Sequence, residues 1–125
     1  LPKAVVEKAK HLAELNGGSI KQSHSQPEAI EDATIIYAKE WGATQDYGNA
    51  EAYQERVAKH QDWQINPQSF DRANTDARLM HCLPVRRNVA VSEDVLDSPR
   101  SIVIAQAHNR LWAQMAILHR LLVRQ

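Results

Sequence analysis

A short strand that runs out into a polar loop is encoded at residues 79–88, which read Leu-Met-His-Cys-Leu-Pro-Val-Arg-Arg-Asn. The apolar run ends in a histidine, the only cysteine of the chain and a Leu-Pro bond, and two arginines follow. Turn residues directly after a short apolar run are typical of a strand that ends at a loop. The stretch predicts a strand at residues 78–81 and, after it, a loop that faces a ligand.

The rest of the chain alternates between strand and helix patterns. β-branched apolar runs predict strands at residues 34–37 and 101–105, and shorter strands are expected at 19–22 and 63–65. Such alternation is typical of βαβ units. The expected fold is therefore an α/β domain, an open parallel sheet with helices on both faces.

Helices are predicted where apolar residues recur at helical spacing or where a cap is encoded. Asn16-Gly17-Gly18 is a stop signal, Ser25 is a cap that Pro27 and Glu28 follow, and Ser92 is a second cap. The predicted helical ranges are 1–16, 25–32, 50–60, 66–72, 93–96 and 106–124. The last helix is expected to bury an apolar stripe formed by Ala107, Leu111, Met115, Leu118 and Leu122.

Composition excludes several classes of protein. The 15 basic and 15 acidic residues give no net charge, which argues against a nucleic-acid binder. A single cysteine indicates a reducing compartment, and no apolar run approaches about 18 residues, so we expect a cytoplasmic protein without a membrane span. The 125 residues make one domain at most. The start at Leu1, directly before Pro2 and a helical pattern, suggests the continuation of a longer protein.

Unusual polar residues follow each expected strand. They are His24, Lys39, the group from His81 to Arg87, and Asn109 with Arg110 in the expected first turn of the last helix. Parallel strands bind ligands beyond their carboxyl ends, so these groups are expected to share one rim. A cation in a first turn opposes the helix dipole unless an anion also binds there. The residues alone therefore predict an α/β domain that binds a small anionic molecule.

Other interpretations of the same residues remain open or fail. Cys82 can equally be a small apolar residue, Arg86 and Arg87 a solvated pair, Lys39 a surface lysine, and Arg110 a salt-bridge partner. A second cysteine or a His-x-x-His pair is missing, which argues against a metal site. Neighbouring strand residues point to opposite faces, so His81 is a poor base for Cys82 and a cysteine hydrolase is rejected. A Gly-x-Gly-x-x-Gly motif is also missing, so a dinucleotide site has no support.

The motif His81-Cys82-Leu83-Pro84, followed by Arg86-Arg87-Asn88, resembles the signature loop of ornithine-type carbamoyltransferases. Asp97-Ser98-Pro99-Arg100-Ser101 and Asn109-Arg110 fit the same family. The resemblance implies that residues 1–125 form most of the second, amino-acid-binding domain, a doubly wound parallel sheet. Enzymes of this family transfer a carbamoyl group from carbamoyl phosphate to an amine, need no metal or organic cofactor, and are usually homo-trimers with active sites between subunits.

A finer resemblance lies in Tyr37-Ala38-Lys39-Glu40-Trp41-Gly42. Family members that act on free ornithine typically carry an aspartate at the position of Lys39, where it pairs with the substrate's α-ammonium. Acylation removes that charge and leaves a carboxylate, so the complementary partner changes from an anion to a cation. Lys39 therefore resembles the branch that uses N-acetyl- or N-succinyl-ornithine, and Val85-Arg86-Arg87-Asn88 looks like that branch too.

The resemblance also implies roles for single residues. Cys82 and Leu83 would line the site beside carbamoyl phosphate and the δ-amine of the acceptor, with a cis bond to Pro84 placing Leu83. Arg110 would bind carbamoyl phosphate and Lys39 the acceptor carboxylate. Cys82 and Arg110 are the expected catalytic residues, and His81, Leu83, Pro84 and Arg86 complete the expected substrate-binding set with Lys39. Catalysis would consist of positioning and stabilisation of the developing oxyanion.

Two family motifs are missing from the chain, the phosphate-gripping Ser-x-Arg-Thr loop and the His-Pro-x-Gln segment. The carbamoyl-phosphate-binding domain is therefore expected to be absent, and the 125 residues alone are expected to be inactive. Two alternatives stay open: an ordinary ornithine carbamoyltransferase, and a non-catalytic amino-acid-binding module of the same fold. The sequence also leaves the choice between acetyl and succinyl specificity open.

Overall fold

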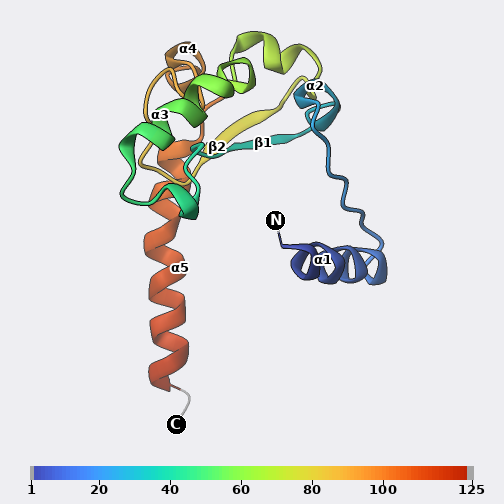
Figure 1. Cartoon of the computed structure of the whole chain (residues 1–125). Helices are drawn as coiled ribbons and strands as arrows, with labels where there is room; N and C mark the ends of the chain where they lie inside the picture. Colours follow the sequence, from blue (N-terminus) through green and yellow to red (C-terminus); the bar gives the residue numbers. More distant parts are fainter. Residues whose placement is uncertain (1, 124–125) are drawn as a thin grey trace.

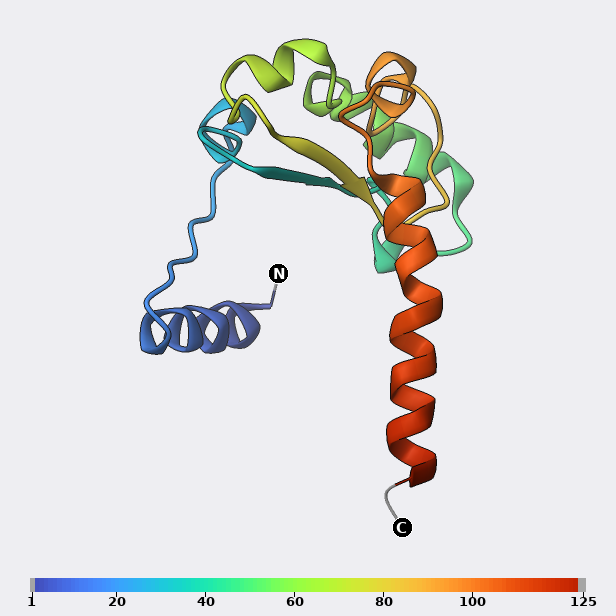
Figure 2. The same ribbon diagram turned by 180° about the vertical axis from the view of Figure 1, so that it is seen from behind.

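The computed structural model describes residues 2–123, apart from the side chain of Thr44. Its centre is a parallel pair of strands, β1 (Ile35–Ala38) and β2 (Arg78–His81), shown in Figures 1 and 2. The register pairs Ile35 with Arg78 and Ala38 with His81, so both strands end at the same edge. A bridge from Leu79 to Ser101 adds a third parallel segment on the other side of β2. The predicted α/β fold with a parallel sheet is confirmed.

Helices flank this sheet. In Figure 1, α3 (Ala50–Lys59) and α4 (Glu93–Leu96) lie on one side of it, and α5 (Val103–Val123) begins near β2 and extends away on the other. α1 (Lys3–Leu15) lies apart from the sheet at the end of an extended segment and has no buried residue. The short elements are α2 (Gln26–Ala29) and the 3-10 helices η1 (Thr44–Asp46), η2 (Gln61–Trp63) and η3 (Pro67–Asp71).

The core forms on one face of the sheet because strand side chains alternate between faces. Ile36 and Leu79 are buried on that face, whereas Ile35 and Tyr37 on the other face are about half exposed. The inward residues pack against side chains from η3, α4 and the loop before α4. Those partners are Phe70, Ala90, Val91, Val95 and Leu96.

Most predicted helix positions are confirmed. Gly17 ends α1 with a φ of 71°, and the Gly18 amide donates to the Ala13 carbonyl at 2.8 Å. The Ser25 hydroxyl caps α2 by accepting from the amide of Glu28. The predicted ends at Leu1 and Arg124 lie outside the described residues.

Three predicted strands are wrong. Residues 101–105 contribute only the Ser101 bridge, because the chain turns into α5 at Val103 immediately after the Ile102 amide donates to the Leu79 carbonyl. Residues 19–22 are extended but belong to no strand of the described structure. At 63–65, Trp63 ends η2 and only Ile65 forms a bridge, to Val91.

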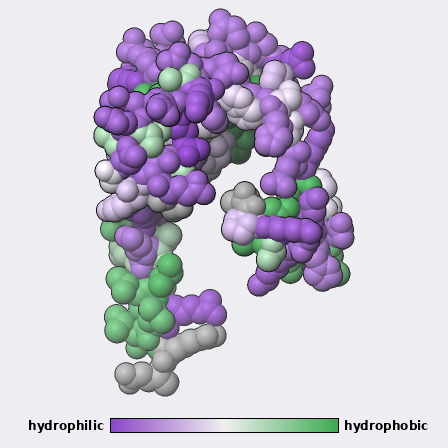
Figure 3. All heavy atoms as spheres, viewed as in Figure 1, coloured by the Kyte–Doolittle hydropathy of each residue, from purple (hydrophilic) through white to green (hydrophobic). Residues whose placement is uncertain are grey.

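Two further expectations about helices fail. Ser92 stands at the start of α4 but its side chain makes no capping bond, and the Asn88 side chain accepts from the Glu93 amide instead, at 2.9 Å. The apolar stripe of α5 is not buried: Leu111 is 52% exposed and Leu118 57% exposed. Figure 3 shows this apolar surface on the far part of α5, which projects clear of the sheet.

Within residues 2–123, none of the helices combines the length and the apolar character that crossing a bilayer requires.

Candidate binding site at the carboxyl ends of the strands

The strand register brings functional side chains from different segments together. Ala38 lies opposite His81, so Lys39 and Cys82 both follow the same edge of the sheet. Gln106 of α5 joins the two strand ends: its Oε1 accepts from the His81 amide at 3.0 Å, and its Nε2 donates to the Tyr37 hydroxyl at 2.9 Å. This side chain therefore fixes the start of α5 against both strands.

A cleft of about 640 Å³ lies at this junction. It gathers five of the residues singled out by the sequence, and the Leu83-Pro84 bond in its wall is cis. Leu83 itself has a φ of 47°, which is the left-handed region. The cleft is lined by Tyr37, His81, Cys82, Leu83, Pro84, Gln106, Ala107 and Arg110.

His81 is the buried anchor of the cleft, with only 1% of its surface exposed. Its Nδ1 accepts from the Leu83 amide at 3.0 Å, so a neutral ring carries its proton on Nε2. Burial lowers the pKa of His81, Glu40 opposes that shift and Lys39 adds to it. Among the described residues, Nε2 has no hydrogen-bond partner. The lowered pKa favours the neutral imidazole, whose Nδ1 shapes the turn to Leu83.

Cys82 is exposed beside this buried histidine. His81 is buried whereas Cys82 is exposed, and the accepting nitrogen of His81 is occupied by the Leu83 amide. This geometry agrees with the rejection of a Cys-His nucleophile pair. Within the described chain, no group of three or more His, Cys, Asp or Glu side chains is placed to hold a metal ion.

Arg110 reaches the cleft from a different part of α5 than the sequence predicted. The helix begins at Val103, so Arg110 is its eighth residue and not part of its first turn. The argument from the helix dipole is therefore wrong for this residue. Gln106 and Arg110 are four residues apart and lie on one helix face, which accounts for their shared position in the cleft. In residues 2–123, the Arg110 guanidinium forms no ion pair or hydrogen bond, which leaves it available to an anion.

Lys39, Arg86 and His24 were predicted to share this rim but lie outside the cleft. Lys39 is exposed and lines a neighbouring, largely apolar hollow of about 350 Å³ together with Trp41. Arg86 lines a further hollow of about 610 Å³, where its guanidinium lies 4.8 Å from the centre of the Tyr53 ring. His24 is exposed in the extended segment before α2 and does not follow a strand.

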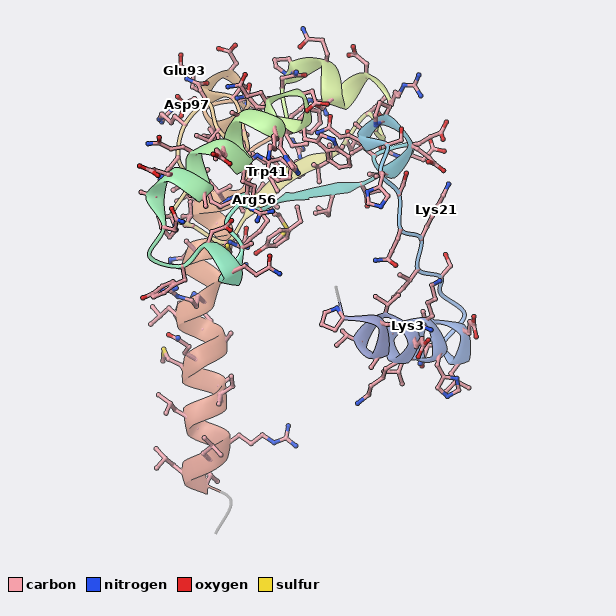
Figure 4. All side chains as sticks on the ribbon, viewed as in Figure 1. Lys3, Lys21, Trp41, Arg56, Glu93 and Asp97 are labelled. Carbon is pink, nitrogen blue, oxygen red and sulfur yellow. The ribbon has the colours of Figure 1, made fainter. Side chains whose placement is uncertain are left out.

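Arg87 has a structural partner. Its guanidinium donates two hydrogen bonds to Asp97, at 2.6 and 2.9 Å, and this pairing lowers the pKa of Asp97. Figure 4 shows Asp97 beside Glu93, at the end of the molecule that carries α4. Both partners are exposed, so we assign the pair to the loop surface and not to the cleft.

Sequence reasoning missed three residues near the site. Gln106 gave a signal that could have found it, since it is the first polar residue after the apolar run at 102–105. Tyr37 lies in a predicted strand, and the strand pattern by itself gives its hydroxyl no role at the site. Glu40 accepts from the amide of Arg86 and from the hydroxyl of Tyr53, contacts between distant segments that leave no local pattern in the sequence.

Known proteins resemble this chain in sequence and in fold. The family model described as "Aspartate/ornithine carbamoyltransferase, Asp/Orn binding domain" matches residues 1–121. An ornithine carbamoyltransferase of Pyrococcus horikoshii is 38% identical over 120 residues, which are 96% of this chain and 37% of that protein. An N-succinylornithine carbamoyltransferase of Bacteroides thetaiotaomicron is 39% identical over 105 residues, which are 84% of this chain and 31% of that protein.

A solved structure gives the same result. The crystal structure of an N-acetyl-L-ornithine transcarbamylase superposes with a TM-score of 0.80 at 35% identity, covering 94% of this chain and 36% of the other. The chain thus spans about a third of the length of the relatives that it matches.

Proposed function

Because the chain belongs to the aspartate/ornithine carbamoyltransferase family, we propose that it supplies the amino-acid-binding half of an N-acylornithine carbamoyltransferase. Residues 1–125 would form most of the amino-acid-binding domain, and a carbamoyl-phosphate-binding domain would complete the site. The reaction would serve arginine biosynthesis, with carbamoyl phosphate and N-acetyl- or N-succinyl-ornithine as substrates. The complete enzyme would be a cytoplasmic homo-trimer without a cofactor.

The observation that carries the choice of substrate is Lys39. Overall identity does not separate the substrate classes, since the ornithine and N-succinylornithine enzymes compared above are 38% and 39% identical to this chain. Lys39 places an exposed ammonium directly after β1, one residue beyond the edge that bears the cleft. A cation there complements the carboxylate of an acylated acceptor and repels the α-ammonium of free ornithine.

The cleft residues fit the transfer of a carbamoyl group. The δ-amine attacks the carbamoyl carbon, the bond from that carbon to the phosphate oxygen breaks, and the departing phosphate takes up the proton that the amine loses. Arg110 would bind the phosphate of carbamoyl phosphate, with its guanidinium offering a fork of donors. Cys82 and Leu83 would contact the reacting groups, on a turn held by His81 and by the cis bond to Pro84. Holding both reactants in one geometry supplies much of the rate enhancement.

The test is a comparison of acceptors with the full-length protein that contains these residues. We expect carbamoylation of acetyl- or succinyl-ornithine and at least about tenfold lower kcat/KM with free ornithine, which corresponds to roughly 1.4 kcal/mol. Lys39→Asp should shift this preference towards free ornithine, and Lys59→Asp, at an exposed lysine of α3, is the control. Preference for free ornithine in the wild type would favour the ordinary ornithine carbamoyltransferase. No turnover with any acceptor would favour a non-catalytic amino-acid-binding module.

A further inference from the structure

The carboxylate of Glu40 joins two loops and a helix. Its Oε1 accepts from the backbone amide of Arg86 at 2.9 Å, and its Oε2 accepts from the hydroxyl of Tyr53 at 3.1 Å. The ring of Tyr53 in turn lies beneath the guanidinium of Arg86, 4.8 Å from its centre. These contacts close a ring of interactions that links the loop after β1, the loop after β2 and α3. We call Glu40, Tyr53 and Arg86 the carboxylate clamp.

The chemistry of the clamp gives each group one role. Burial, followed by the bond to Glu40, raises the pKa of Tyr53, so its hydroxyl keeps the proton that it donates. The aromatic face beneath Arg86 attracts a guanidinium, so the same tyrosine fixes Glu40 with its hydroxyl and Arg86 with its ring. A second link, from Arg56 of α3 to Asp46 of η1 at 2.6 Å, holds the loop after β1 to the same helix. Figure 4 labels Arg56 on α3.

We propose that Glu40 and Tyr53 are positioning residues for the amino-acid acceptor, acting through Arg86 and through the loop that carries Lys39. This inference rests on the proposed function, because it assigns the clamp to the acceptor end of that site. Lys39 and Arg86 are the two cations of the predicted substrate-binding set that lie outside the cleft. Glu40 accepts a hydrogen bond from the amide of Arg86 and directly follows Lys39 in the sequence. Their relative position therefore depends on Glu40.

The clamp should affect binding of the acylated ornithine and leave binding of carbamoyl phosphate unchanged. Arg110 belongs to α5, which is fixed to the strand ends by the bonds of Gln106 to His81 and Tyr37. None of these bonds involves Glu40, so its loss should leave the carbamoyl phosphate end in place. Loss of Glu40 frees the Arg86 amide and the Tyr53 hydroxyl together, and both loops lose a shared anchor.

The experiment is steady-state kinetics on the full-length protein that contains this chain, with both substrates varied. We expect Glu40→Ala to raise the KM for the acylated ornithine about tenfold, a change equivalent to roughly 1.4 kcal/mol. The KM for carbamoyl phosphate and kcat should change less than about twofold, because the α5 contacts remain. Glu40→Gln should recover most of the loss, because its amide oxygen still accepts from Arg86. Glu55→Ala removes an exposed glutamate of α3 and is the matched control.

Amide hydrogen exchange on the full-length protein that contains this chain checks the clamp without any turnover. The Arg86 amide should lose protection in Glu40→Ala and keep it in Glu40→Gln. An equal rise of both KM values, or an unchanged acceptor KM in Glu40→Ala, would overturn the inference while the wild-type activity stands. A wild type that carbamoylates no ornithine would overturn the proposed function and this inference with it.

Discussion

Replacing Gln106 with alanine tests the contact that joins the two strand ends to α5. The change removes the acceptor of the His81 amide and the donor to the Tyr37 hydroxyl. His81 is 1% exposed, so its amide is left without a partner where water has poor access. An unsatisfied buried donor costs about 1–3 kcal/mol, and the exposed bond to Tyr37 adds about 0.5 kcal/mol. We expect Gln106→Ala to lower the free energy of unfolding by about 2 kcal/mol.

Urea denaturation followed by tryptophan fluorescence measures this loss. A slope of about 1–3 kcal/mol per molar urea converts 2 kcal/mol into a midpoint shift of roughly 1 M. Gln114→Ala, at an exposed position of the same helix, controls for the change in helix propensity. Gln106→Glu should lose less than Gln106→Ala, because its carboxylate still accepts from the His81 amide. A Gln106→Ala protein within about 0.5 kcal/mol of Gln114→Ala would refute the reasoning.

Three further predictions concern α4, pH and the surface of α5. Loss of the cap of α4 should make Asn88→Ala at least about 1 kcal/mol less stable in the same urea assay, whereas Ser92→Ala should be close to neutral because its hydroxyl makes no capping bond; the reverse order would restore Ser92 as the cap. The pKa of His81 is lowered in the fold, so its contribution to stability is fully present above the unfolded pKa of about 6.5 and is lost as pH falls through the lower folded pKa. Thermal unfolding between pH 5 and 8 should show this loss, and His81→Asn should reduce the pH dependence of the melting temperature. Leu118 is 57% exposed on the apolar helix α5, so Leu118→Lys should reduce concentration-dependent association in sedimentation velocity. The free energy of unfolding should fall by no more than about 0.5 kcal/mol. Unchanged association would show that the exposed face of α5 is not where the chains contact one another.

Much of the fold could be predicted because its signals are local. Gly17 ends α1 by accepting a positive φ, and the Ser25 hydroxyl caps α2, so both boundaries depend on residues that are close in sequence. The β-branched pair at Ile35 and Ile36 marked β1 for the same reason. Local pattern failed at residues 101–105, where an apolar run fits a strand and the start of a buried helix equally well. The chain enters α5 at Val103, so within the described residues this segment contributes to the sheet only through the bridge from Ser101 to Leu79.

The same difference between local and distant contacts decides how much of the site could be predicted. The residues from His81 to Pro84 line one cleft at the end of β2, as expected for groups that follow a parallel strand, and Arg110 reaches the same cleft from α5. Lys39 and Arg86 follow the same strands but line separate hollows, because the direction of a loop side chain depends on tertiary contacts such as the ring of Tyr53. Glu40 could not be found from sequence, since its two partners lie 13 and 46 residues away.

The hydrogen bond from the His81 amide to Gln106 also fixes which groups donate and which accept in the neighbouring hydrogen bond to Tyr37. A main-chain N-H can only donate, so the atom facing it must be the carbonyl oxygen of Gln106, and the NH₂ group must face Tyr37. The phenolic oxygen of Tyr37 therefore accepts a hydrogen bond from Gln106, and the hydroxyl hydrogen of Tyr37 points away from Gln106. The backbone amide of His81 in β2 thus orients, through the carboxamide of Gln106, the hydroxyl proton of Tyr37 in the neighbouring strand β1.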